Sequence, residues 1–160
     1  MIKIAFVCHG NICRSPMAEF VFKNMINIGG VDKHYYVVSL ATSDEEIWQG
    51  KGNPIHEGTL GIFQKYNIPF NKAKRAVQLQ RSDYDSFDLF IGMDFANVRN
   101  MHRIFGSDPL CKIKLLLDYA GEHREVADPW YTGDFEKTYR DVLKGCEGLL
   151  STQGEKNEVQ

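Results

Sequence analysis

A cysteine and an arginine stand six positions apart near the start of the chain, as Cys8 and Arg14. An ionised cysteine is a nucleophile, and the planar guanidinium of arginine donates paired hydrogen bonds to an oxyanion. Gly10 and Asn11 lie between them, and both residue types tolerate the positive φ angles of a loop whose backbone N–H groups turn toward one point. This spacing predicts a thiolate that attacks a bound phosphate group.

The flanking residues place this loop between a strand and a helix N-terminus. Residues 2–7 form the nearly continuous apolar run IKIAFV, which is typical of a strand buried on both faces. Ser15 and Pro16 predict a helix start with the Ser15 hydroxyl as its N-cap, and Gly29-Gly30 predicts the end of the helix. A helix N-terminus favours an anion. Together with a hydrogen bond from Ser15, it is expected to favour ionisation of Cys8.

An aspartate in the string Asp128-Pro129-Trp130-Tyr131 is a candidate general acid. The oxygen that leaves a phosphomonoester departs more easily when an acid protonates it. Asp128 follows the last predicted strand, Pro129 stiffens the backbone, and the two aromatic residues are suited to contact an aryl group. An ordinary turn aspartate would have the same local sequence, so spacing alone leaves both roles open.

The loop from Cys8 to Pro16, CHGNICRSP, resembles the signature loop of the low-molecular-weight protein tyrosine phosphatases. The string at 128–131 resembles the general-acid loop of that family, and the likeness spans Lys3 to Leu150. The resemblance implies an enzyme that hydrolyses phosphotyrosine in proteins, or small aryl phosphates, through a phosphocysteine intermediate. It implies catalytic roles for Cys8, Arg14 and Asp128, inorganic phosphate as product, and no cofactor.

The resemblance also assigns roles around the loop. It implies that Asn11, Ser15 and Ser39 form a supporting hydrogen-bond network, although the same side chains are suited to satisfy a turn or a strand end. The family pattern has a histidine three residues before Arg75, where this chain has Lys72. The residues expected to bind phosphate are His9, Gly10, Asn11, Ile12, Cys13, Arg14 and Ser15. The residues expected to form the substrate pocket are Ile12, Trp48, Trp130 and Tyr131.

The remaining cysteines allow alternative interpretations. Cys13 is either a packed core thiol or a second thiol that traps oxidised Cys8 as a reversible disulfide. Cys111 and Cys146 are interpreted as structural. Cys8, His9 and Cys13 lack a fourth zinc ligand with suitable spacing, and a bound metal would consume the nucleophile, so no metal is expected.

Three other functions are compatible with an oxyanion loop. A thiol-dependent arsenate reductase needs additional thiols to relay a disulfide, and residues 72–91 contain no cysteine. A protein-arginine phosphatase would need partners for the guanidinium donors, whereas the branched apolar Ile12 is better suited to pack on a ring. A phosphate or phosphopeptide binding module would not need Cys8, Arg14 and Asp128 together. Phosphotyrosine hydrolysis is therefore the favoured prediction.

Strands and helices alternate along the rest of the chain. This order implies right-handed crossovers and an α/β three-layer sandwich, with a four-stranded parallel sheet between helices and the phosphate-binding loop at its carboxyl edge. Asp94 and Asp134 are predicted N-caps. The further strands are expected at 35–40, 87–93 and 113–117, and the further helices at 56–66, 94–105 and 134–150.

Composition favours one globular domain. The chain has 160 residues, of which 43% are hydrophobic, and we expect a phosphatase domain at 1–150 and a polar, frayed tail at 151–160. A formal net charge of −2 predicts neither nucleic-acid nor membrane binding. The strand begins at residue 2 with no signal peptide before it, and four cysteines suit a reducing compartment, so a cytoplasmic monomer is expected.

Overall fold

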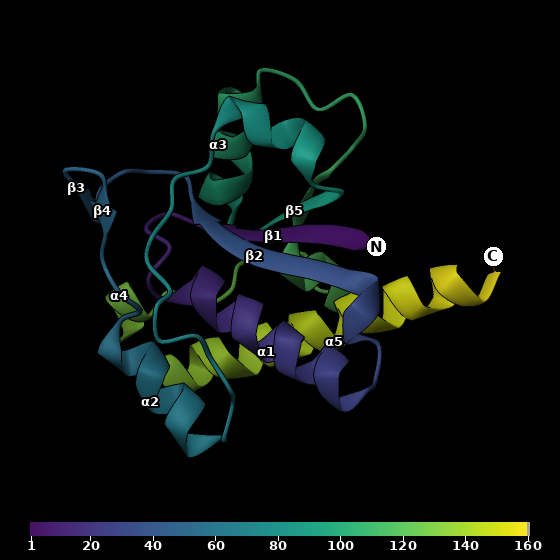
Figure 1. Cartoon of the computed structure of the whole chain (residues 1–160), viewed down its shortest axis with the longest axis horizontal. Helices are drawn as coiled ribbons and strands as arrows, with labels where there is room; N and C mark the ends of the chain where they lie inside the picture. Colours follow the sequence, from purple (N-terminus) through teal and green to yellow (C-terminus); the bar gives the residue numbers. More distant parts are fainter. Residues whose placement is uncertain (160) are drawn as a thin grey trace.

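A four-stranded parallel sheet in the order β2-β1-β5-β6 lies at the centre of the protein (Figure 1). The computed structural model describes residues 1–159, with side chains through Lys156. All three strand pairings are parallel, and β1 pairs with both β2 and β5. The strands are β1 (Ile2–Cys8), β2 (Tyr35–Ala41), β5 (Leu89–Gly92) and β6 (Ile113–Leu115). The predicted α/β sandwich with a four-stranded parallel sheet is confirmed.

Helices cover both faces of this sheet. Helices α1 (Arg14–Ile28) and α5 (Phe135–Val159) lie side by side on one face, and α3 (Phe95–Phe105) covers the other (Figure 1). Side chains of β1 alternate between the two layers, because successive residues of a strand point to opposite faces. Phe6 and Cys8 join the core under α1 and α5, whereas Val7 joins the core under α3.

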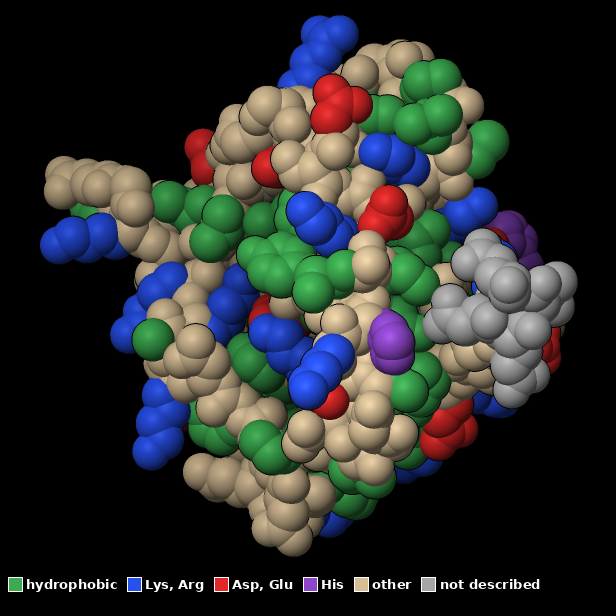
Figure 2. All heavy atoms as spheres, turned by 45° about the vertical axis from the view of Figure 1, so that its right-hand side comes forward, with side chains coloured by type: hydrophobic (Ala, Val, Ile, Leu, Met, Phe, Trp, Pro, Cys, Tyr) green, Lys and Arg blue, Asp and Glu red, His purple; other side chains and the backbone are tan. Residues whose placement is uncertain are grey.

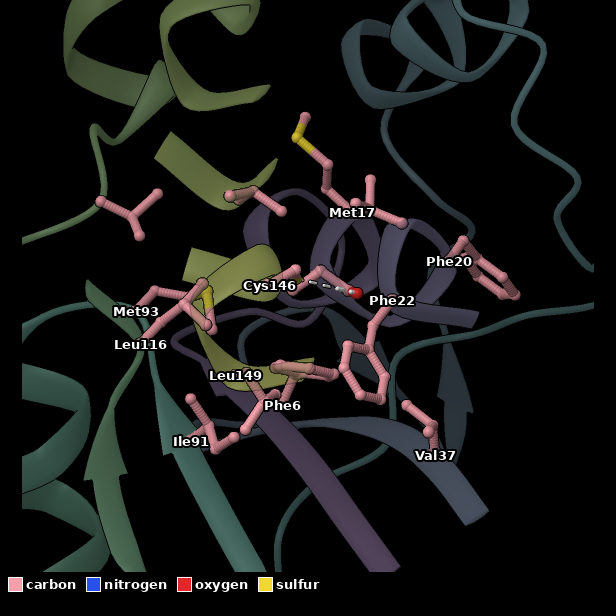
Figure 3. Close-up of a cluster of buried hydrophobic side chains, with 14 of the residues drawn as sticks. Phe6, Met17, Phe20, Phe22, Val37, Ile91, Met93, Leu116, Cys146 and Leu149 are labelled. Carbon is pink, nitrogen blue, oxygen red and sulfur yellow. Dashed lines mark hydrogen bonds between the residues drawn. The ribbon is translucent and has the colours of Figure 1, made fainter. Parts of the chain in front are cut away.

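The larger core holds α1 and α5 against the sheet. Figure 3 shows Phe6 of β1, Phe22 of α1 and Leu149 of α5 meeting there, and all three side chains are fully buried. The rings of Phe6 and Phe22 meet edge to face, with centroids 5.8 Å apart. Because β1 leads directly into the loop and α1 leads directly out of it, this packing fixes both ends of the loop.

Shorter elements connect these layers. Residues 44–54 contain a hairpin, whose two-residue turn at Gln49 and Gly50 has positive φ angles of 51° and 78°. Such angles match the twist of paired strands. The hairpin projects from the left of the view in Figure 1. The short elements are η1 (Asp32–His34), β3 (Ile47–Trp48), β4 (Lys51–Gly52), α2 (Glu57–Lys65), η2 (Arg81–Ser86), η3 (Leu116–Ala120) and α4 (Pro129–Thr132).

The predicted helix starts are right for two helices and wrong for α1. Asp94 Oδ1 accepts the N–H of Asn97, and Asp134 Oδ1 accepts the N–H of Lys137, so both aspartates are N-caps. Helix α1 instead begins at Arg14, and no side chain caps it. Ser15 thus lies inside the first turn, where its hydroxyl is free to contact other groups.

The last helix is longer than predicted. Helix α5 continues to Val159, whereas the sequence predicted a frayed tail from residue 151; residue 160 lies outside the described residues. Gln153 is 4% exposed, and Thr152 Oγ1 donates a hydrogen bond to the backbone oxygen of Gly148. Gln, Glu and Lys are good helix formers, so a polar sequence here extends the helix instead of ending it.

The surface carries charges of both signs. On the face shown in Figure 2, Lys and Arg side chains lie interspersed with Asp and Glu side chains. This distribution agrees with a formal net charge of −2. Within residues 1–159, none of the helices has the length and apolar character needed to cross a bilayer.

Candidate active site

Cys8 lies at the carboxyl end of β1, on the floor of a cavity, and is 4% exposed. Its Sγ is 3.0 Å from Ser15 Oγ and accepts a hydrogen bond of 3.3 Å from the backbone N–H of Asn11. Both groups favour a negative sulfur, because a hydroxyl and an amide can each donate to it. The Ser15 hydroxyl thus contacts the sulfur, as the sequence analysis expected, and does not cap α1.

Asn11 shapes the loop. Its φ of 60° is in the left-handed region that Asn tolerates better than most residues. The Asn11 Nδ2 group donates to Ser15 Oγ at 2.8 Å and to Ser39 Oγ at 2.9 Å. Its Oδ1 accepts from the backbone N–H of Val77 at 3.0 Å. The structure thus brings Asn11, Ser15 and Ser39 into the one network that the resemblance implied.

Two charged residues that the sequence analysis did not assign complete this network. Ser39 Oγ donates to Glu19 Oε1 at 2.6 Å, and Lys74 Nζ donates to Asn11 Oδ1 at 3.1 Å and to the backbone oxygen of Ser39 at 2.8 Å. Lys72, where the family pattern pointed, is exposed and makes no such contact. The family pattern, counted back from Arg75, pointed to Lys72, which lies two residues before the residue that contacts Asn11, Lys74.

Arg14 is held in the cavity by two carboxylates. The buried guanidinium has its Nη2 2.8 Å from Asp94 Oδ2 and 3.4 Å from Asp128 Oδ2, while Nη1 donates to the backbone oxygen of Val126. Burial lowers the pKa of Arg14, but the negative charges of Cys8, Asp94 and Asp128 outweigh it and raise the pKa above its ordinary value. Arg14 is therefore a permanent cation beside Cys8.

Asp94 has a second role that its sequence position did not reveal. Its Oδ1 caps α3 through the N–H of Asn97 at 2.7 Å, while its Oδ2 binds Arg14. One carboxylate thus fixes the guanidinium to the start of a helix. The sequence predicted only the cap, because nothing in the local pattern links Asp94 to a residue eighty positions earlier.

Asp128 lies at the cavity wall with its two oxygens in different environments. Oδ1 accepts the N–H of Trp130 at 3.0 Å and so caps α4, while Oδ2 faces Arg14. The side chain is 30% exposed, so solvent and substrate can reach it. The structure therefore brings Cys8, Arg14 and Asp128, which the sequence separates by 120 positions, into one site.

The cavity has a volume of about 690 Å³, and the seven loop residues expected to bind phosphate contribute six of its lining residues. Ile12, Trp130 and Tyr131 line the cavity, and both aromatic side chains are more than four-fifths exposed. Trp48 does not line the cavity, because it lies on the projecting hairpin. Ser15 is fully buried and does not line the cavity. The six loop residues that line the cavity are His9, Gly10, Asn11, Ile12, Cys13 and Arg14.

The other cysteines differ from Cys8 in their surroundings. Burial, followed by the negative charges of Cys8 and Asp128, raises the pKa of Cys13 to about 12, so Cys13 stays a thiol at neutral pH. Cys146 lies in the core and donates weakly to the backbone oxygen of Ala18 (Figure 3). Burial also raises its pKa. Neither thiol is suited to attack a substrate.

Comparisons with known proteins agree with this geometry. The family model described as low molecular weight phosphotyrosine protein phosphatase matches residues 3–159. A Bacillus subtilis protein, low molecular weight protein-tyrosine-phosphatase YfkJ, is 40% identical, with 95% of this chain and 96% of the relative covered. A crystal structure of a low molecular weight protein tyrosine phosphatase from Streptococcus pyogenes has a TM-score of 0.84 and 44% identity, with 95% and 93% covered. The chain belongs to the low molecular weight phosphotyrosine protein phosphatase family, as its two loops predicted, and is a cysteine-dependent phosphotyrosine hydrolase.

Proposed function

We propose that Cys8, Arg14 and Asp128 hydrolyse phosphotyrosine in two steps. In the first step Cys8 Sγ attacks phosphorus, an S–P bond forms, and the P–O bond to the tyrosine breaks. The loop N–H groups and Arg14 stabilise the charge on the equatorial oxygens. The observation that carries this proposal is the placement of Asp128 Oδ2 3.4 Å from Arg14 Nη2, at the wall of the cavity that has Cys8 on its floor.

Asp128 exchanges a proton in both steps. As a carboxylic acid it donates its proton to the departing phenolic oxygen. The resulting carboxylate then takes a proton from a water molecule that attacks the phosphocysteine. The S–P bond breaks, inorganic phosphate leaves, and the Cys8 thiolate is restored. Apart from the attacking water molecule, both steps use groups of the chain and of the substrate.

The cavity walls favour an aryl substrate. Trp130 and Tyr131 stand at the rim, and the apolar Ile12 lines the wall near Cys8. A phenyl ring packs well against such side chains, whereas the Ile12 side chain offers no acceptor to the N–H donors of phosphoarginine. We therefore assign phosphotyrosine proteins and small aryl phosphates as substrates. A reducing, cytoplasmic setting suits a reaction that depends on a thiolate.

The test is phosphate release from phosphotyrosine and phosphoarginine peptides of matched sequence. We expect the wild type to prefer phosphotyrosine in kcat/KM, and Cys8→Ser to bind inorganic phosphate without turnover, because a hydroxyl is a poor nucleophile and Arg14 remains. Ile12→Thr should lower the ratio of kcat/KM for the phosphotyrosine peptide to kcat/KM for the phosphoarginine peptide. Substantial turnover by Cys8→Ser would refute the covalent mechanism, and a wild-type preference for phosphoarginine would refute the substrate assignment.

A further inference from the structure

Lys74 places an ammonium group behind the loop, outside the cavity that holds the substrate. Its side chain is 13% exposed, and Lys74 does not line the cavity. Burying an ammonium is costly unless it is paired and hydrogen-bonded. Lys74 Nζ binds Asn11 Oδ1 and the backbone oxygen of Ser39, and it lies 4.0 Å from Glu19 Oε1. These contacts all belong to the network that ends at Cys8.

The orientation of the Asn11 amide follows from its donors. Oδ1 faces two donors, Lys74 Nζ at 3.1 Å and the N–H of Val77 at 3.0 Å. A flipped amide would place its NH₂ group against both of them, leaving four N–H groups without acceptors in a buried site. Lys74 and Val77 therefore fix Asn11 with Nδ2 directed at Ser15 and Ser39.

This orientation of Asn11 determines where the hydroxyl protons of Ser39 and Ser15 point. Ser39 donates its single proton to Glu19, which as a carboxylate only accepts. Ser15 Oγ accepts one N–H from Asn11, so the proton of Ser15 remains available for Cys8 Sγ at 3.0 Å. The chain of hydrogen bonds thus has one direction, from the amide that Lys74 fixes to the sulfur.

The positive charge of Lys74 also favours the thiolate form of Cys8. Burial, the largest effect, lowers the pKa of Lys74, as does Lys23, whereas the negative charges of Glu19 and Cys8 raise it. An attraction between Lys74 and the Cys8 thiolate is mutual, so the ammonium also stabilises the thiolate. Arg14 supplies a cation on the cavity side. Lys74 supplies one from the opposite side of the loop.

We propose that Lys74 is a positioning residue of the reaction, which directs the Ser15 hydroxyl proton to Cys8 through Asn11 and favours the thiolate with its charge. The proposal rests on the assignment of Cys8 as the nucleophile. The family pattern has a histidine in this network, where this chain has Lys74.

The test is the rate of alkylation of Cys8 by iodoacetamide as a function of pH, with the labelled residue identified by peptide mass spectrometry. Alkylation forms an S–C bond and releases iodide, so it reports the thiolate without any phosphatase turnover. We expect Lys74→Met to react about tenfold more slowly than wild type near pH 6, and the two rates to converge at alkaline pH. Lys74→Gln, which retains a donor but no charge, should lie between them.

Lys72→Met is the matched control, because Lys72 is an exposed lysine two residues away. Its alkylation profile should match that of the wild type. A Lys74→Met profile that overlays those of the wild type and Lys72→Met would overturn the proposal, even if kcat fell. Should Lys74→Met not fold, a Lys74→Gln profile equal to the wild type would overturn it. Turnover by Cys8→Ser would contradict the assignment of Cys8 as the nucleophile. It would not alter the comparison of alkylation rates between the wild type and the Lys74 variants.

Discussion

Replacing Asp94 by Asn should weaken both the fold and the site. Asp94 caps α3 with Oδ1 and binds Arg14 with Oδ2 at 2.8 Å. Asparagine is as good an N-cap as aspartate, so its oxygen can retain the bond from the N–H of Asn97. Its NH₂ group must then face Nη2 of Arg14. The substitution therefore keeps the cap and replaces an ion pair by two opposed donors.

The expected loss of stability follows from burial. Arg14 and Asp94 side chains are 5% and 15% exposed, and removing one partner of a buried pair costs about 3 to 5 kcal/mol. Asp128 lies 3.4 Å from the same Nη2 and offsets part of this cost. We therefore expect a decrease of about 2 to 3 kcal/mol in the free energy of unfolding. Displacement of the guanidinium should also lower kcat/KM about tenfold or more.

Urea denaturation and p-nitrophenyl phosphate hydrolysis measure the two effects. Asp134→Asn is the control, because Asp134 is the N-cap of α5 through the N–H of Lys137 and none of its described contacts is with an arginine. That variant should change stability by less than about 0.5 kcal/mol. Equal losses in Asp94→Asn and Asp134→Asn would show that the Arg14 contact contributes nothing beyond the cap, and our reasoning would be wrong.

Three further predictions concern the acid, the second thiol and helix α2. Asp128→Asn should lower kcat by about 10² to 10⁴ for aryl phosphates with poor leaving groups and much less for good ones, and equal losses across the series would contradict the assignment. Since burial raises the pKa of Cys13 to about 12, iodoacetamide at neutral pH should label Cys8 and not Cys13, as peptide mass spectrometry would show. Gly58→Ala should destabilise the protein to urea by about 1 to 3 kcal/mol, because the added Cβ would lie 2.3 Å from the Phe135 ring. In Gly61→Ala on the same helix, the added Cβ has no atom within 4 Å, so this variant should stabilise the protein by up to about 1 kcal/mol.

The parts of the site that are local in sequence could be predicted from it. The apolar run at 2–7, Gly10 and Asn11 indicated a strand and a loop, and the structure has β1 ending at Cys8 and Asn11 at φ 60°. The start of α1 was misjudged by two residues for a physical reason. The Ser15 hydroxyl has better partners in Cys8 Sγ and Asn11 Nδ2 than in the backbone of its own helix.

The long-range contacts of the site could not be predicted in this way. Asp94 has a complete local explanation as an N-cap, so its bond to Arg14 left no separate signal. Lys74 lies in an irregular segment without periodicity, and its contact with Asn11 spans 63 positions. Trp48 was expected in the substrate pocket from the resemblance, but it lies on the β3–β4 hairpin and does not line the cavity.

The parallel sheet explains why residues so distant in sequence meet. Parallel strands present their carboxyl ends at one edge, and each of the four contributes a part of the site there. Strand β1 ends at Cys8, β2 carries Ser39 near its end, β5 is followed by Asp94, and the connection after β6 leads to Asp128. Arg14 joins the contributions of β5 and β6 through its two carboxylate contacts. The register between β1 and β5, which pairs Val7 with Gly92, therefore sets the distance between the nucleophile and the carboxylate that holds Arg14.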